Sequence, residues 1–238
     1  CGLSLAPFGA AHRAELEKVY GLLADDHSRK VLRDVVEYKL TGDIKLLRGC
    51  ESEPREAWES ILRPGKEEHY MDLGAYTGDT IAEFIGYAGE WRRITALEPD
   101  PVTFAKLERN TAGLHDCILY RLGAYSRYAR LPFAGGAGRG SHLAADGAMT
   151  ELDSVDNILC GQTVSLINMD VEGMEAEAIA GMAKTLRRHR PKLLIAGYHR
   201  SEDLWRLPLE VLAIQPEYKV YVRHYPCLPA WDVNFYFV

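Results

Sequence analysis

The 238 residues carry a formal net charge of −6, and 47% of them are hydrophobic and 26% charged. This composition is typical of an ordinary globular protein and excludes the disordered and fibrous classes. The negative balance argues against a general affinity for nucleic acid or for an anionic membrane, because both ligands require a basic surface. A small molecule is therefore the expected partner.

The five cysteines are odd in number and form no C-x-x-C pair, so neither a disulfide framework nor a zinc knuckle is expected. This usage favours a reducing, cytoplasmic compartment. The sequence has no apolar run of about 18 residues and no secretion signal. It opens on Cys1 rather than methionine, which indicates that something upstream is missing or has been processed.

The start of the chain is expected to be helical. Residues 11–24 and 28–40 carry apolar side chains at helical spacing. We therefore predict a helical N-terminal cap over residues 1–50, followed by the main domain over residues 51–238. Because apolar stripes need a surface to bury, these helices should cover the ligand crevice or form an interface, for example in a homo-oligomer.

From about residue 67, short apolar runs alternate with amphipathic segments, which predicts an α/β fold with a parallel sheet covered on both faces. The runs are 69–73, 93–98, 117–124, 165–170, 192–198, 218–225 and 233–238. The last two runs follow each other closely, which predicts an antiparallel hairpin at the C-terminal edge. The glycine-rich stretch 131–150 shows no periodicity and is predicted to be a loop over the site.

The first predicted strand runs into YMDLGAYTGDT, in which two glycines lie four residues apart. In an open parallel sheet the ligand crevice lies at the carboxyl ends of the strands. Gly74 and Gly78 would provide a tight turn and a close approach of backbone to ligand. The helix that starts near Thr80 would then offer backbone N–H groups to an anion.

Acidic residues around this turn discriminate between ligands. The spacing differs from the G-x-G-x-x-G of dinucleotide sites, and Asp72 is a poor neighbour for phosphates. S-adenosylmethionine fits better, because it combines an ammonium group, a carboxylate and a cationic sulfonium. In ALEPDP, Glu98 lies 20 residues after Gly78, where an acid at the end of a strand can accept hydrogen bonds from ribose hydroxyls.

A third motif, INMDVEGMEAEAI, follows a later apolar run. Asp170 ends this strand and would bring an acid to the crevice beside the methyl donor. Glu172 follows it at once. An acidic helix start is an alternative explanation for Glu172 and Glu175.

The motifs YMDLGAYTGDT, ALEPDP, LINMDVEGMEAEAIAGM and PKLLIAGYHRSEDLWRLP together resemble the FkbM family of S-adenosylmethionine-dependent methyltransferases, over about residues 20–238. The resemblance implies a Rossmann-like, seven-stranded methyltransferase sheet, with Asp170 near the reacting centre. Family members usually methylate hydroxyls of sugars, polyketides or related metabolites. Where this chain has Met174, the family often has alanine or another small residue, so a substrate contact there is not carried over.

The residues expected to bind the cofactor belong to these motifs or border them: Asp72, Gly74, Tyr76, Gly78, Thr80, Glu98, Pro99, Gly123, Ala124 and Asp170. His199 and Asp170 are the candidate catalytic residues, because a neutral hydroxyl needs a base and histidine titrates in the useful range. Glu172 and His142 are candidate substrate contacts, and His142 is also a weaker candidate base. No metal is expected, because the acids and histidines lack close ligand spacing.

Two other functions use the same features. A nicotinamide-dependent oxidoreductase would share the sheet, but it is disfavoured by the missing glycine and by Asp72. A non-catalytic protein that binds the cofactor would keep the fold and lose the base, and the presence of Asp170 and His199 speaks against it.

Overall fold

The computed structural model describes residues 11–134, 142–143, 148–226 and 232–238. The strands are β1 (His69–Leu73), β2 (Arg93–Leu97), β3 (Cys117–Tyr120), β4 (Gly123–Ala124), β5 (Ala129–Ala134), β6 (His142–Leu143), β7 (Ala148–Asp153), β8 (Leu166–Met169), β9 (Lys192–Ala196), β10 (Val220–His224) and β11 (Val233–Phe237).

The helices are α2 (Arg13–Leu22), α3 (Asp26–Thr41), α4 (Ile44–Gly49), α5 (Pro54–Glu56), the π-helical segment η1 (Ala57–Leu62), α6 (Asp79–Ala88), α7 (Pro101–Thr111), α8 (Val155–Leu159), α9 (Glu175–Gly181), α10 (Ala183–His189) and α11 (Asp203–Ile214). Within the described ranges, none of these helices is both long enough and apolar enough to cross a bilayer.

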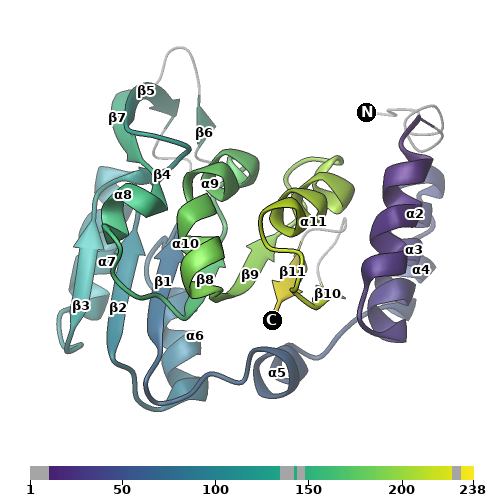
Figure 1. The fold of residues 1–238 in the computed structure, drawn as a ribbon, viewed down its shortest axis with the longest axis horizontal. Coiled ribbons are helices and arrows are strands. Elements are labelled where there is room, and N and C mark those ends of the chain that lie inside the picture. Colours follow the sequence, from purple (N-terminus) through teal and green to yellow (C-terminus); the bar gives the residue numbers. More distant parts are fainter. Residues whose placement is uncertain (1–10, 135–141, 144–147, 227–231) are drawn as a thin grey trace. The chain divides into compact units, whose positions relative to one another are not determined.

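Strand pairing gives one seven-stranded sheet in the order β10-β11-β9-β8-β1-β2-β3 and one four-stranded sheet in the order β4-β7-β5-β6 (Figure 1). In the large sheet, β1 is parallel to both β2 and β8, while β10 and β11 form an antiparallel hairpin. The predicted fold class, a mostly parallel methyltransferase-type sheet with a C-terminal hairpin and N-terminal helices, is confirmed.

By its internal contacts the chain divides into two compact units, residues 62–195 and residues 1–61 with 196–238. The division at residue 50 between a cap and a main domain stays a prediction.

The unit of residues 62–195 is built around β1 and β8, whose side chains are almost entirely buried. Such strands read as continuous apolar runs because helices cover both faces of a parallel sheet. Tyr70 of β1 stacks on Phe84 of α6, with ring centroids 4.2 Å apart and planes 4° from parallel. This contact fixes the helix that follows the glycine turn against the strand that precedes it.

The prediction of a loop over residues 131–150 is wrong in part. In the described part of that stretch, β5 pairs antiparallel with β7 from Ala129 opposite Leu152 to Phe133 opposite Ala148. The local periodicity of the sequence does not predict these strands, because their side chains are half exposed and because β5 contains Pro132. The predicted strand 117–124 is likewise divided into β3 and β4. The chain leaves the end of β3 and enters β4. Figure 1 shows the small sheet beyond that end of β3.

In the unit of residues 1–61 and 196–238, the N-terminal segment covers the outer edge of β10. The Ala24 amide donates to the Val220 carbonyl at 2.8 Å, and the Ser52 amide donates to the His224 carbonyl at 2.7 Å. Between them, the Val222 amide donates to Oγ of Ser28 at 3.1 Å. An edge strand with unpaired backbone groups invites aggregation, so the N-terminal helices protect this edge.

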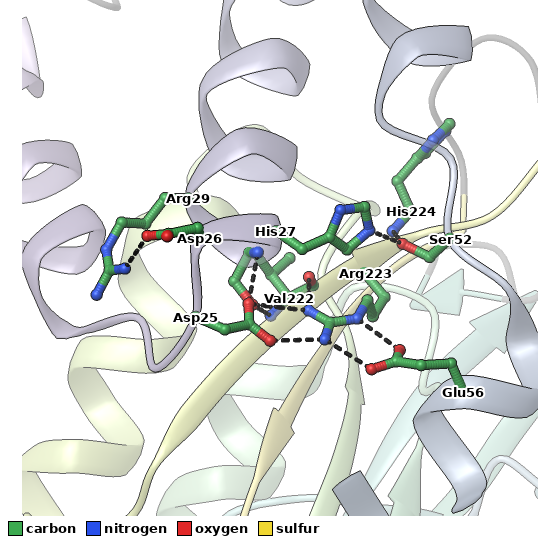
Figure 2. Close-up of polar contacts among 10 residues, drawn as sticks. Asp25, Asp26, His27, Arg29, Ser52, Glu56, Val222, Arg223 and His224 are labelled. Carbon is green, nitrogen blue, oxygen red and sulfur yellow. Dashed lines mark hydrogen bonds and ion pairs between the residues drawn. The ribbon is translucent and has the colours of Figure 1, made fainter. Parts of the chain in front are cut away.

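A buried arginine fastens the same helices to β10 (Figure 2). The side chain of Arg223 is 2% exposed and forms ion pairs with Asp25 at 2.7 Å and with Glu56 at 2.9 Å. Asp25 is also the N-cap of α3, where it accepts a hydrogen bond from the Ser28 amide at 2.7 Å. Burial raises the pKa of Asp25, but the hydrogen bonds from Arg223 and Ser28 outweigh it and bring the pKa to about 2.

Candidate functional site

The glycine turn after β1 is held in shape by the end of β2. Gly74, Tyr76 and Gly78 have φ angles of +85°, +46° and +90°. Glycine adopts such angles freely, whereas Tyr76 adopts its angle at some cost in strain. The amides of Gly74 and Ala75 both donate to the Leu97 carbonyl, at 3.0 and 2.9 Å. The turn therefore lies directly beside the residue that precedes Glu98.

Gly74 also allows β1 and β8 to end side by side. A Cβ atom at this position would lie 1.9 Å from the carbonyl oxygen of Asp170, so no side chain fits there. The Asp170 amide donates to the Leu73 carbonyl at 2.9 Å. The backbone of the predicted catalytic residue Asp170 thus packs against the predicted cofactor turn.

Glu98 is a nearly buried carboxylate, 7% exposed, that two backbone amides hold in place. Its Oε2 accepts a hydrogen bond from the Tyr76 amide at 3.0 Å, and its Oε1 accepts one from the Asp100 amide at 2.8 Å. Burial raises the pKa of Glu98 to about 7, although both hydrogen bonds lower it. A carboxylate has about four acceptor positions, so both oxygens keep capacity for further donors.

Asp72 lies beneath the turn rather than on its surface. Its side chain is fully buried, at 0% exposure. Oδ1 accepts from the Asn168 amide group at 2.9 Å, and Oδ2 accepts from the hydroxyls of Thr80 at 2.5 Å and Tyr70 at 3.2 Å. Burial raises the pKa of Asp72 to about 6, against the lowering effect of these three hydrogen bonds.

The loop after β8 has its own internal support. Glu172 and Gly173 have φ angles of +53° and +91°. The side chain of Glu175 is 1% exposed, and its Oε1 accepts from the amides of Val171 and Gly173, each at 3.2 Å. Glu175 therefore shapes the loop that presents Asp170, a structural role that its place at an acidic helix start did not reveal. Glu172 itself is half-buried.

Gly123 and Ala124 form β4, the strand that starts the small sheet, and both are buried. A Cβ atom at Gly123 would lie 2.4 Å from Leu152 of β7 and 3.8 Å from the Cβ of Pro99. This contact places the residue next to the chain segment that carries Glu98. Pro99 itself is half-buried.

Two further predicted residues, His142 and His199, lie on other segments of the chain. The backbone of His142 pairs with Ala134 in the small sheet, but its side chain lies outside the described part of the structure. His199 follows the end of β9 by three residues and belongs to the other unit. Its ring lies 4.3 Å from that of Tyr198.

Local sequence motifs thus identified the turn and its acids but missed their partners. Tyr70 could have been found from its position, because it lies two residues before Asp72 on the same face of β1. Asn168 could not, because it reaches Asp72 only through the pairing of β1 with β8, in which the two residues are opposite each other.

Comparison with known proteins places this site in a family. The family model described as the Methyltransferase FkbM domain matches residues 72–221, which begin at Asp72 and include Glu98 and Asp170. The match covers more than half of the chain. No curated protein matches the chain.

Solved structures agree with this assignment. The methyltransferase FkbM from Methylobacillus flagellatus is 26% identical with a TM-score of 0.86, over 99% of this chain and 61% of that chain. Two others share only the fold. Aeropyrum pernix fibrillarin, solved with natively bound S-adenosyl-L-methionine, is 13% identical with a TM-score of 0.50, over 77% of this chain and 71% of its own. An rRNA methylase from Streptococcus thermophilus is 12% identical with a TM-score of 0.51, over 78% and 96%.

The present chain thus spans 61% of the length of the FkbM protein that it resembles. The family match and the glycine turn with its two buried acids lead to one conclusion: this chain belongs to the FkbM methyltransferase domain family.

Proposed function

We propose that this protein is an S-adenosylmethionine-dependent O-methyltransferase that acts on a hydroxyl group of a sugar, a polyketide or a related small metabolite. The observation that carries the proposal is Glu98, a carboxylate held by two backbone amides at the end of β2 and beside the glycine turn. Paired hydroxyls, as in a ribose, are natural donors to a carboxylate fixed in this way.

The residues around the turn fit the cofactor. Glu98 would accept hydrogen bonds from the two ribose hydroxyls. The helix α6 begins after Gly78, an N-cap without a side chain, so its first backbone N–H groups suit the carboxylate of the methionine moiety. Gly123, Ala124 and Pro99 would border the adenosine. When bound, the cofactor would supply an electrophilic methyl group on a cationic sulfur.

The remaining task of the protein is to hold the acceptor hydroxyl in line with the methyl group and to remove its proton. Alignment supplies much of the rate in such a displacement. Asp170, whose backbone is fixed between Leu73 and the glycine turn, is our first candidate to orient or deprotonate the hydroxyl. His199 is the second candidate base, Glu172 and His142 remain proposed substrate contacts, and a base would contribute about 10²–10⁴-fold.

The test is transfer of a labelled methyl group from S-adenosylmethionine to a panel of hydroxylated metabolites, compared among the wild-type chain, Asp170→Asn and His199→Ala. Transfer that requires Asp170 or His199 supports the proposal. Cofactor binding without transfer to any hydroxyl would instead favour the non-catalytic cofactor-binding protein, and tight binding of a nicotinamide dinucleotide would favour an oxidoreductase.

A further inference from the structure

The acid that precedes the glycine turn has no surface to offer a ligand. Asp72 is 0% exposed, in contrast to Glu98, which keeps 7% of its surface accessible at the same edge of the sheet. A ligand can contact only atoms that solvent can also reach, unless the protein rearranges. A direct ion pair between Asp72 and the ammonium group of a cofactor, which the sequence favoured, is therefore at odds with the burial of this side chain.

What Asp72 does contact is the set of elements that form the site. Its oxygens accept from Thr80 in the first turn of α6, from Asn168 in β8 and from Tyr70 in its own strand β1. Asn168 lies two residues before Asp170, and Thr80 lies two residues after Gly78. One carboxylate thus joins the strand before the glycine turn, the helix after it and the strand that ends just before Asp170.

We propose that Asp72 is a positioning residue, which fixes the glycine turn and the end of β8 against each other so that the cofactor site is preformed. The identity of the ligand in this proposal rests on the proposed function. Asp72 acts through its hydrogen bonds to Thr80 and Asn168, and it makes no contact with the ligand.

This role requires acceptor oxygens and not a negative charge, because the three donors are two hydroxyls and one neutral amide group. An asparagine at position 72 can still accept from Thr80 and Tyr70 through its oxygen. Its side-chain NH2 group can donate to Asn168 if the side-chain amide of Asn168 rotates by about 180°. The Asn168 oxygen then faces the nitrogen of the new asparagine. A leucine of similar size can do neither and leaves the donors buried without partners.

Two probes separate positioning from direct contact. S-adenosylhomocysteine carries the ammonium and carboxylate groups, whereas 5′-methylthioadenosine has the same adenosine and a thioether without them. Calorimetry should show that Asp72→Leu and Thr80→Val weaken the binding of both probes, about tenfold or more for the leucine. Asp72→Asn should keep both affinities within about threefold of wild type. A loss of about tenfold or more for S-adenosylhomocysteine alone in Asp72→Asn would show a direct contact and overturn the proposal.

A matched control is Thr185→Val. The Thr185 hydroxyl, at the start of α10 in the same unit, donates to the half-buried carboxylate of Asp156 at 2.7 Å. This variant loses the same kind of hydrogen bond and should leave both affinities unchanged.

Hydrogen exchange gives a second readout that needs no ligand. In the unliganded protein, Thr80→Val should speed amide exchange in residues 78–85 relative to wild type, and Thr185→Val should not. If wild type binds neither probe, the proposed function fails, while the exchange result still decides whether Asp72 and Thr80 hold the turn. Unchanged exchange in residues 78–85 in both Thr80→Val and Asp72→Leu would overturn the positioning role.

Discussion

The backbone amide of Tyr76 donates a hydrogen bond of 3.0 Å to Oε2 of Glu98, which lies 22 residues later in the chain. The positive φ of Tyr76 goes with this contact, because the left-handed conformation lets the turn aim an amide at the end of β2. The turn and the acid are therefore one unit, in which the backbone sets the direction of the carboxylate.

Cofactor binding should depend on pH through Glu98. Its pKa of about 7 means that the carboxylate is partly protonated at neutral pH, and a protonated acid accepts hydrogen bonds from the ribose hydroxyls less well. The affinity for S-adenosylhomocysteine should therefore fall as the pH drops below 7, by up to about tenfold for each pH unit. Calorimetry from pH 5.5 to pH 8.5 measures this, and Glu98→Gln should flatten the profile. A wild-type profile as flat as that of the glutamine variant would contradict the assignment.

The stability of the unliganded protein should carry the signature of Asp72. A folded-state pKa of about 6 lies above the usual value of 3.8, so the folded chain binds more protons than the unfolded chain between these pH values. The contribution of Asp72 to stability is thus fully present below about pH 3.8 and is lost as the pH rises through 6. Asp72→Asn should not lose stability in this way, because asparagine does not titrate.

Relative to wild type, Asp72→Asn should therefore gain on the order of 2–3 kcal/mol of unfolding free energy between pH 4 and pH 8. Urea unfolding at a series of pH values measures the difference. If the unfolding free energies of the two proteins changed with pH in parallel, the surroundings of Asp72 would not destabilise its charged form. The charge of Asp72 is also one of the causes that raise the pKa of Glu98, so the variant reduces the pH-dependent loss from Glu98 as well.

Arg223 should be among the most sensitive positions in the unit that contains the N-terminal helices (Figure 2). Arg223→Met removes the cation and leaves Asp25 and Glu56 without it, and because these acids are 34% and 40% exposed and can be hydrated, the loss of unfolding free energy should be about 2 kcal/mol. Arg13→Met is the control, because Arg13 pairs with Glu17 on the surface, with 78% of the arginine side chain exposed. Equal melting temperatures for the two variants would argue against a buried clamp.

The same network should respond to acid. The pKa of Asp25 lies at about 2 in the folded chain, below its usual 3.8, so its contribution to stability is present above pH 3.8 and is lost as the pH falls toward 2. The unfolding free energy of Asp25→Asn should lack this acid-dependent contribution, because asparagine does not titrate.

Deletion of residues 1–45 should expose the outer edge of β10, whose backbone groups pair with Ala24 and Ser28. We expect the shortened chain to aggregate, which light scattering would detect, and to lose activity. Equal solubility, stability and activity would mean that these helices are appended without a role. Sedimentation of the full chain tests the proposed self-association through exposed apolar side chains of the helices, such as Leu22 and Leu40.

The sequence predicts the main sheet well, for a physical reason. Strands such as β1 and β8 are buried on both faces, so their apolar runs stand out from the amphipathic helices between them. The small sheet was missed because the pairing of β5 with β7 depends on partners distant along the chain, and exposed side chains such as Met149 blur the alternation.

In the site, the local motifs led to Gly74, Gly78 and Glu98 because turn geometry and strand ends leave a signature in a few adjacent residues. The burial of Asp72 has no such signature. It depends on Asn168, 96 residues away, and on the register that places the two residues opposite each other. The sequence therefore points to Asp72 but predicts for it a ligand contact that its burial disfavours.

Calorimetric titration of the wild-type chain and of Glu98→Ala with S-adenosylmethionine, S-adenosylhomocysteine and a nicotinamide dinucleotide tests whether the chain binds an adenosyl methyl donor. We expect wild type to bind the first two ligands and not the third. Glu98→Ala should weaken both by about 1.5–3 kcal/mol for each charge-assisted hydrogen bond lost, while Glu90→Ala, at an exposed position, should bind as wild type does. No binding of either adenosyl ligand to folded wild-type protein at millimolar concentration would rule out the proposed cofactor.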